Sequence, residues 1–299
     1  MQGEPHNQDG DGMRLAWRPA CRMDTRPRPM SDDVYEIYAV KYGRHERRSA
    51  DNFIGGDTHD VPMPLDYFVW AIVGNSRTFI LDTGFDQRAA DARKRKIIHP
   101  VGEGLRALGI DPDKVKDVII SHLHYDHAGN HDLFPNAGYH LQECEMEYAT
   151  GRCMCHAMTR APFEASDVTA MVDRVFKGRV EFHNGSAELA PGLSVHLIGG
   201  HSKGLQATRV KTRRGWVVLG SDAAHFYAHL DHGRVFPITY NVADVLAGYD
   251  KVAKLATSRD HIVPGHDPIT LDIYPAARPG MEGWAARLDA DPKPRAMSG

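Results

Sequence analysis

Runs of apolar residues at two different spacings predict a mixture of strands and helices along the chain. The β-rich runs "YFVWAIVG" and "RTFILDTG" are separated by Asn75 and Ser76 and predict an antiparallel hairpin. Three other stretches, "VGEGLRALGI", "ASDVTAMVDRVFKG" and "NVADVLAGYDKVAKLA", carry apolar residues at helical spacing. Ser166 and Asn241 stand near the starts of the last two stretches and are the expected N-caps. We therefore expect an α/β chain.

Four apolar, strand-like runs end in a small residue or proline that is followed at once by His or Asp. They are "VIISHLH" with His122 and His124, "VHLIGGH" with His201, "VVLGSD" with Asp222 and "HIVPGH" with His266. Strands that end at one rim of a sheet deliver the next residues to the same place, and small residues let the backbone turn sharply there. One shared site would explain all four runs.

The stretch "SHLHYDHAGN" crowds four side chains that can bind metal into six residues, namely His122, His124, Asp126 and His127. His122 and His124 are two residues apart, so they point to the same side of an extended segment. In a chain with 18 histidines, this spacing arises by chance with a probability of roughly half a percent. A surface histidine cluster is the alternative for the stretch, and solvated loop residues are the alternative for the three distant residues taken singly.

Seven candidate ligands are too many for one tetrahedral zinc ion, but they suit two ions about 3.5–4 Å apart. They divide into two sets of three and one bridge: His122, His124 and His201; Asp126, His127 and His266; and Asp222. The aspartate is the expected bridge because a carboxylate has two oxygens, whereas imidazole offers one usable lone pair. The expected cofactor is two Zn²⁺ per chain, with Mn²⁺ or Fe²⁺ as alternatives.

The composition excludes several classes of protein. With 36 Lys and Arg against 39 Asp and Glu, the net charge is −3, without the basic excess of a nucleic-acid binder. The basic cluster "RKRK" at Arg93–Lys96 is interpreted as a solvated helix face. The sequence contains no run of 18 apolar residues, so it predicts no membrane helix. Four cysteines without a disulfide pattern, together with an N-terminus that lacks an apolar signal segment, favour a reducing cytoplasm.

The 299 residues are long enough for one sizeable core. From the polarity of the ends we expect a flexible N-terminal extension over residues 1–32 and a flexible C-terminal tail over residues 286–299. The folded domain would then cover residues 33–285.

In this order, "SHLHYDHAGN", "GGHSKG", "GSDA" and "VPGHD" resemble the metallo-β-lactamase superfamily, and "LDTG" at Leu81–Gly84 resembles its early strand-end turn. The segments "HDVPMPLDYFVWAI" and "GHSKGLQ" resemble more closely the N-acyl-homoserine lactonase group, including aromatic lactone hydrolases such as 4-pyridoxolactonase. The resemblance implies an αββα sandwich of two mixed sheets with helices on the outer faces and metals at one sheet edge. It also implies that Asp82 braces the ligand loops; a simple turn former is the alternative.

The same resemblance implies a dinuclear-metal hydrolase that opens a lactone ring by attack of a metal-bridging hydroxide. The substrate would be an acyl-homoserine lactone or an aromatic or heterocyclic lactone, and the protein would be a homodimer without nucleic-acid or membrane partners. A thiolester hydrolase of the glyoxalase II type is the main alternative, beside hydrolases of other small esters or amides. A non-catalytic binding protein should have lost ligands, and all seven are present.

One position departs from the lactonase pattern. Three residues after the expected bridging aspartate, where the lactonases usually have tyrosine, this chain has His225. Histidine can donate a proton near neutral pH, so we expect His225 or Asp126 to protonate the departing ring oxygen; a packing role for His225 is the alternative. The residues expected to line the substrate pocket are Phe53, Ile54, Met63, Phe226 and Tyr227.

Overall fold

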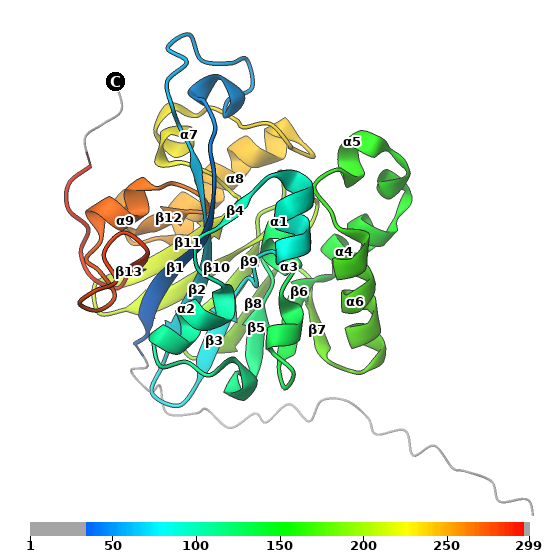
Figure 1. The fold of residues 1–299 in the computed structure, drawn as a ribbon, viewed down its shortest axis with the longest axis vertical. Helices are drawn as coiled ribbons and strands as arrows, with labels where there is room; N and C mark the ends of the chain where they lie inside the picture. The colour runs from blue at the N-terminus through cyan, green and yellow to red at the C-terminus, as the bar shows by residue number, and fades with distance from the viewer. Residues whose placement is uncertain (1–33, 296–299) are drawn as a thin grey trace, which may run out of the picture. The chain divides into compact units, whose positions relative to one another are not determined.

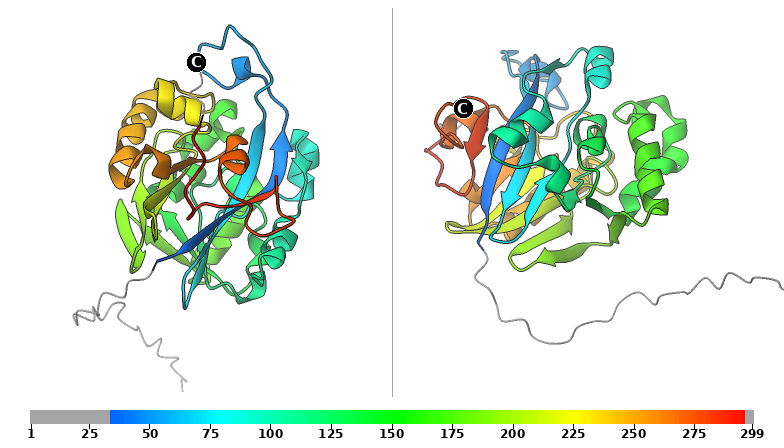
Figure 2. Two further views of the ribbon diagram at one scale, coloured as in Figure 1. Left: turned by 90° about the vertical axis from the view of Figure 1, so that its left-hand side faces the viewer. Right: turned by 60° about the horizontal axis from the view of Figure 1, so that its bottom comes forward.

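The computed structural model describes residues 34–295 of the chain. Within this part, the strands form one sheet of eight strands and one of five, and helices lie on the outer faces (Figure 1). Figure 2 shows the two sheets facing one another between the helices. The αββα sandwich expected from the sequence is confirmed. The extension expected over residues 1–32 lies outside the described residues.

The first sheet has the order β13-β1-β2-β3-β5-β6-β7, and the short β4 also pairs with β1. Its strands are β1 (Glu36–His45), β2 (Leu65–Val73), β3 (Thr78–Leu81), β4 (Lys96–Ile97), β5 (Asp117–Ile119), β6 (Gly138–Gln142), β7 (Val180–His183) and β13 (Ala285–Arg287). The hairpin predicted around Asn75 and Ser76 is confirmed, since β2 and β3 pair antiparallel. From β3 to β7 the neighbouring strands are parallel.

The second sheet has the order β12-β11-β10-β9-β8. Its strands are β8 (Ser186–Ala190), β9 (Leu193–Leu197), β10 (Gln206–Thr212), β11 (Gly215–Ser221) and β12 (Ile262–Pro264). β9 and β11 are both antiparallel to β10, and β12 is parallel to β11. The carboxyl ends of β9, β11 and β12 therefore reach the same edge, where the residues that follow them can meet.

Side chains of β2 alternate between two cores, so the first sheet is buried on both faces. Phe68, Trp70 and Ile72 belong to the core between the sheets, whereas Tyr67 and Val69 pack toward the helices. The helices that contribute buried residues to this outer core are α1 (Gln87–Arg93), α2 (Val101–Ala107), α3 (Tyr125–Ala128), α4 (Glu143–Thr150) and α6 (Ala165–Phe176). On the other side, α8 (Val242–Leu255) covers the second sheet.

The remaining helices are short: α5 (Ala157–Arg160), α7 (Tyr227–His232) and α9 (Ile269–Ile273). In the described part of the chain, no helix has the length and apolar character needed to span a membrane.

The two predicted N-caps have different outcomes. The side chain of Asn241 accepts a hydrogen bond from Ala243 N, so the cap of α8 is confirmed. Ser166 is not a cap, because α6 already begins at Ala165. The buried face of α6 does not include its last residue, Phe176, which is 88% exposed.

The predicted boundary at residue 285 lies inside a paired strand. β13 pairs antiparallel with β1 and includes Ala286 and Arg287. Leu288 is fully buried in the core between the sheets. The folded region therefore continues past residue 285, because these residues complete one edge of the first sheet.

Candidate metal centre

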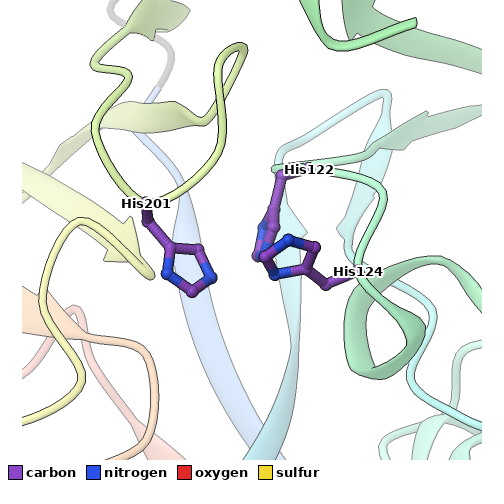
Figure 3. Close-up of side chains that lie close together, drawn as sticks. All are labelled: His122, His124 and His201. Atoms are coloured by element: carbon purple, nitrogen blue, oxygen red, sulfur yellow. The ribbon is translucent and has the colours of Figure 1, made fainter. Parts of the chain in front are cut away.

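Loops that follow β5, β9, β11 and β12 bring the seven candidate ligands together at one edge of the sandwich. β5 leads to His122 and His124, β9 to His201, β11 to Asp222 and β12 to His266. Figure 3 shows the rings of His122, His124 and His201 directed toward one another. All seven side chains are buried. Segments far apart in the sequence thus meet as the strand ends predict.

The possible ligand atoms fall into overlapping groups in which all atoms lie within 4.8 Å of one another. Two of these groups are the two sets of three expected from the sequence: His122, His124 and His201; and Asp126, His127 and His266. One metal ion with ligand bonds of about 2 Å can span such a group. The geometry therefore suits divalent cations.

Asp222 lies between the two sets, with one oxygen toward each. Its Oδ1 lies 3.3 Å from His127 Nε2 and 3.0 Å from His266 Nε2. Its Oδ2 lies 3.2 Å from His201 Nε2. A Cβ on Gly265 would lie 2.7 Å from Asp222 Oδ1, so glycine at this position keeps the space around the carboxylate open. This arrangement is the one that a bridging carboxylate requires.

Several polar atoms at the centre of the cluster fit metal coordination because they are buried without a hydrogen bond. His122 Nε2, His127 Nε2, His201 Nε2 and Asp222 Oδ1 are buried and make no hydrogen bond within the part of the chain that the structure describes. Buried polar atoms without a partner are rare and costly. Divalent cations would satisfy all four atoms.

The protonation states of the histidines also favour cation binding. Burial, followed by the charges of neighbouring imidazoles, holds the pKa of His122 and of His124 well below the ordinary value. Burial lowers the pKa of His201 to about 4. A neutral imidazole keeps its lone pair for a metal. Burial also opposes protonation of His127 and His266, but the neighbouring carboxylates, Asp222 first and then Asp126, together outweigh it and raise the pKa of both, so this half of the cluster attracts positive charge.

Asp82 contacts the loop that carries the first ligands. It is fully buried and has a left-handed backbone conformation with φ 64°. Its Oδ1 accepts a hydrogen bond from Ser121 N at 2.7 Å, and its Oδ2 accepts one from Ser121 Oγ at 2.8 Å. Oδ2 also lies 2.7 Å from His127 Nδ1. A proton on that nitrogen would face the carboxylate and leave Nε2 free to bind a metal.

Glu145, a residue that the sequence did not single out, connects two ligand loops. It lies on α4, is fully buried, and burial raises its pKa. Its Oε1 accepts a hydrogen bond from Leu123 N at 2.9 Å. Its Oε2 accepts hydrogen bonds from Ser202 Oγ and Gly204 N, both at 2.8 Å. A Cβ on Gly204 would lie 2.4 Å from Glu145 atoms, so only glycine allows this close approach.

His225 reaches the cluster from the loop after β11. Its ring stacks on Phe236 with centroids 3.7 Å apart. Its ligand atom lies within 4.8 Å of those of His201 and Asp222. Burial lowers the pKa of His225 to about 3, despite the opposing effect of the Asp222 carboxylate. The imidazole is therefore neutral near pH 7.

A cavity of about 170 Å³ opens above the cluster, and both Asp126 and His225 line it. Tyr67, Tyr125 and Ile238 form part of its wall. A larger cavity of about 770 Å³ lies at the opposite end of β3 and β5 and contains none of the seven candidate ligands. The smaller cavity is therefore the place where a substrate would meet the cluster.

None of the five residues expected to line the substrate pocket lines this cavity. Phe226 and Tyr227 are only 1% and 4% exposed, because both turn inward. Phe53 packs edge-on against His229, Ile54 is half exposed, and Met63 donates its backbone N–H to the carbonyl of Arg47. The expectation was wrong because apolar character alone does not show which wall a side chain faces.

Comparisons with known proteins give the chain its family. The N-acyl homoserine lactonase AttM of Azorhizobium caulinodans is 30% identical over 181 residues, which are 58% of this chain and 64% of that protein. The N-acyl homoserine lactonase AiiB of Agrobacterium fabrum is 32% identical over 180 residues, which are 55% of this chain and 61% of that protein. The chain thus aligns with less than two thirds of the length of either relative.

A solved structure shows the same fold. It is an N-acyl homoserine lactone hydrolase with the product N-hexanoyl-L-homoserine bound at its catalytic metal center. It matches with a TM-score of 0.64 and 22% identity, over 78% of this chain and 94% of the matched chain. The model of the metallo-beta-lactamase superfamily matches residues 63–271, more than half of the sequence. The chain therefore belongs to the metallo-β-lactamase superfamily.

Proposed function

We propose that this protein is a metal-dependent hydrolase that opens lactone rings. The observation that carries the proposal is the position of Asp222, whose two oxygens face two different sets of histidines. Relatives that are 30% and 32% identical are named N-acyl homoserine lactonases, which supports a lactone as the substrate. An acyl-homoserine lactone and an aromatic or heterocyclic lactone both fit this class.

The residues of the cluster would hold two divalent cations, with zinc as the proposed metal. His122, His124 and His201 would hold one cation, Asp126, His127 and His266 the other, and Asp222 would join both. Bound there, the cations would polarise the lactone carbonyl and make a water molecule acidic enough to lose its proton near pH 7. A cytoplasmic location and a homodimer stay predictions from the sequence.

The protein's own side chains would position the substrate and move protons. Asp126 and His225 both line the cavity, so each is placed next to a lactone that enters it. Asp126 is ionised at neutral pH: burial opposes ionisation, but the charges of His127 and His266 outweigh burial and hold its pKa below the ordinary value. We propose that the Asp126 carboxylate takes up the proton released by the attacking water and passes it to the departing ring oxygen, while His225 donates a hydrogen bond to that oxygen.

A substrate panel tests this function. Protein purified without chelator is mixed with acyl-homoserine lactones, aromatic lactones, thiolesters and β-lactams, and acid release is followed with a pH indicator. We expect ring opening of lactones that stops after removal of metal by a chelator and returns after addition of Zn²⁺. Activity confined to thiolesters would instead support the glyoxalase II type of hydrolysis, and activity confined to β-lactams would also contradict the proposal.

A further inference from the structure

Basic side chains line one wall of the cavity above the cluster, although the chain as a whole is slightly acidic. His45 and Arg47 come from the end of β1 and the loop after it, whereas Arg93 and Arg95 come from the end of α1 and the segment before β4. The two segments lie side by side because β4 pairs antiparallel with β1 (Figure 1). An adjoining hollow of about 400 Å³ shares three of these residues.

This wall contains half of the basic cluster Arg93–Lys96, for which the sequence predicts a solvated helix face. That interpretation was wrong, because α1 ends at Arg93 and the chain turns at Lys94 with φ 54°. The turn and the following strand direct Arg93 and Arg95 to the cavity. Lys96, the next residue, is exposed and does not line it.

Two of the guanidinium groups in this wall have no carboxylate partner. Arg93 is neutralised by Glu164, with Nη2 2.7 Å from Oε1. Arg95 instead donates to Tyr125 Oη at 3.1 Å and to the carbonyl of Arg93 at 2.6 Å, and Arg47 donates to the carbonyl of Asp51. Among the described residues, neither Arg95 nor Arg47 forms an ion pair with a carboxylate of the chain. Partly buried charge is costly without a counter-charge, so this wall suits an anion.

The hydrogen bonds of Arg95 connect this wall to the cluster. Tyr125, which accepts the hydrogen bond from Arg95, stands between two candidate ligands in the sequence, and its Oη lies 3.0 Å from Tyr67 Oη. The ring of Tyr67 packs edge-on against His266 at 5.2 Å. An anionic group next to a lactone that occupies the cluster would therefore meet Arg95.

The pKa of His45 is also affected by the positive charges of this wall. Its Nε2 lies 3.1 Å from Arg95 Nη1. Burial, followed by the charges of Arg95 and Arg47, lowers the pKa of His45 to about 4. The imidazole is thus neutral near pH 7 and can accept a hydrogen bond from Arg95 without adding a charge.

We propose that the substrate is an anionic lactone, whose carboxylate or phosphate group binds to Arg95 and Arg47 while its ring lies at the histidine cluster. The inference rests on the proposed lactone hydrolysis and names the substrate class. A guanidinium group binds either anion through two parallel hydrogen bonds, so the two groups share one recognition chemistry. An acidic substrate explains why two cations without carboxylate partners stand at the mouth of a metal-binding cluster.

The test compares two lactones that differ in one charge, 5-oxotetrahydrofuran-2-carboxylate and its methyl ester. In the wild type we expect a KM for the acid at least about 10-fold below that for the ester. Arg95→Gln should raise the KM for the acid by about 10- to 100-fold, the usual effect of a hydrogen bond to a charged group, and should affect the ester much less. Lys96→Gln is the matched control and should leave the KM ratio unchanged.

Two further measurements complete the test. Arg95→Lys keeps the charge and should restore part of the preference for the acid, which separates loss of charge from damage to the fold. Calorimetric titration of wild type and Arg95→Gln with glutarate and with inorganic phosphate distinguishes the two anions. We expect one of the two anions to bind more tightly to the wild type and to bind more weakly to Arg95→Gln. That anion shows whether the substrate carries a carboxylate or a phosphate group.

The two proposals fail in different ways. If lactones are hydrolysed but the acid and the ester have the same KM, the anionic substrate is ruled out and lactone hydrolysis remains. The same holds if Arg95→Gln raises the KM for the acid and for the ester by the same factor. If no lactone of the panel is hydrolysed by protein that retains its metal, the proposed function itself fails. Inhibition of lactone hydrolysis by a short RNA, relieved equally by Arg95→Gln and Lys96→Gln, would instead assign the basic wall to nucleic acid.

Discussion

The Nε2 atom of His225 lies 3.0 Å from Oδ2 of Asp222, the same oxygen that faces His201. The imidazole is therefore held beside the cluster on the side that lines the cavity. We expect His225→Phe, which keeps a ring on Phe236 but cannot donate a hydrogen bond, to lower kcat for a lactone by about 100-fold, the lower end for loss of one hydrogen-bond donor to an oxygen that becomes negatively charged. The measurement is a steady-state rate with metal content checked in parallel.

His225→Tyr is the informative second variant. A hydroxyl at this position can donate a hydrogen bond, as in the lactonase pattern. On a logarithmic scale, kcat of this variant should therefore lie closer to the wild type than to His225→Phe. Equal activity of His225→Phe and the wild type would show that the histidine only packs. Loss of metal in His225→Phe would instead make the histidine a ligand rather than a donor.

The four strand ends could be predicted from the sequence because one local rule describes them all. Each apolar run reaches a small residue or proline and then a ligand-type side chain. Because the strands point in the same direction, these side chains come to the same edge. His201 and Asp222 therefore meet although nothing local connects them. The αββα arrangement followed from the same motifs through the family resemblance.

Contacts made across the fold could not be predicted in the same way. Glu145 is buried between two exposed glutamates, and no feature of the sequence distinguishes it from them. Arg95 looked like part of a solvated basic run, because a sequence does not show that β4 folds back beside β1. On α8 the apolar stripe is wider than the covered face, so Val242 and Leu246 are 46% and 41% exposed.

The second prediction concerns metal content. We expect about two metal ions per chain in protein purified without chelator, from the two sets of ligands that share Asp222. Asp222→Asn preserves the shape of the side chain but removes its charge, and it should lower the content to about one ion or fewer. Metal analysis of both proteins after extensive dialysis checks this.

A control is needed because His140, Glu181 and His183 also bring three ligand atoms within 4.8 Å of one another, between β6 and β7. His183→Ala should leave the content at about two ions. A fall in His183→Ala together with full retention in Asp222→Asn would move the metals away from the proposed centre. Removal of metal from the wild type should also lower Tm, since a ligand that binds only the folded state stabilises it.

The third prediction concerns Glu145, which holds the loop of Leu123 and the loop of Gly204 together. Glu145→Gln replaces one acceptor oxygen by an amino group that would face a backbone N–H. Leaving a buried donor unsatisfied costs about 1–3 kcal/mol of unfolding free energy. A shift of about 1 Å in the ligand loops should also lower kcat/KM by about 100-fold.

Chemical denaturation and steady-state rates measure the two effects separately. Glu147→Gln is the matched control, because this residue lies on the same helix but is exposed. The control should change neither quantity. A Glu145→Gln variant with wild-type stability and rate would show that the ligand loops are held by other contacts.

The fourth prediction uses Asp167, a buried residue in the first turn of α6. Burial, followed by the charges of Asp86 and Glu164, raises its pKa from 3.8 to about 7. Between these two values the folded protein binds more protons at this site than the unfolded chain does. Its contribution therefore makes the folded protein less stable as the pH rises from about 4 to about 7.

Asp167→Asn replaces the titrating carboxyl group by an amide and so removes this pH dependence. The variant should be more stable than the wild type at pH 8, by about 1 kcal/mol after allowance for solvent screening and for the favourable effect of a negative charge at a helix start. The difference should shrink as the pH falls and vanish below about pH 4, where the aspartate is protonated in both states. Urea denaturation at pH 4, 6 and 8 measures it, with the exposed Asp250→Asn on α8 as the control that should show no such trend. A variant that is equally or less stable at pH 8 would mean that Asp167 is solvated and ionised in the folded protein.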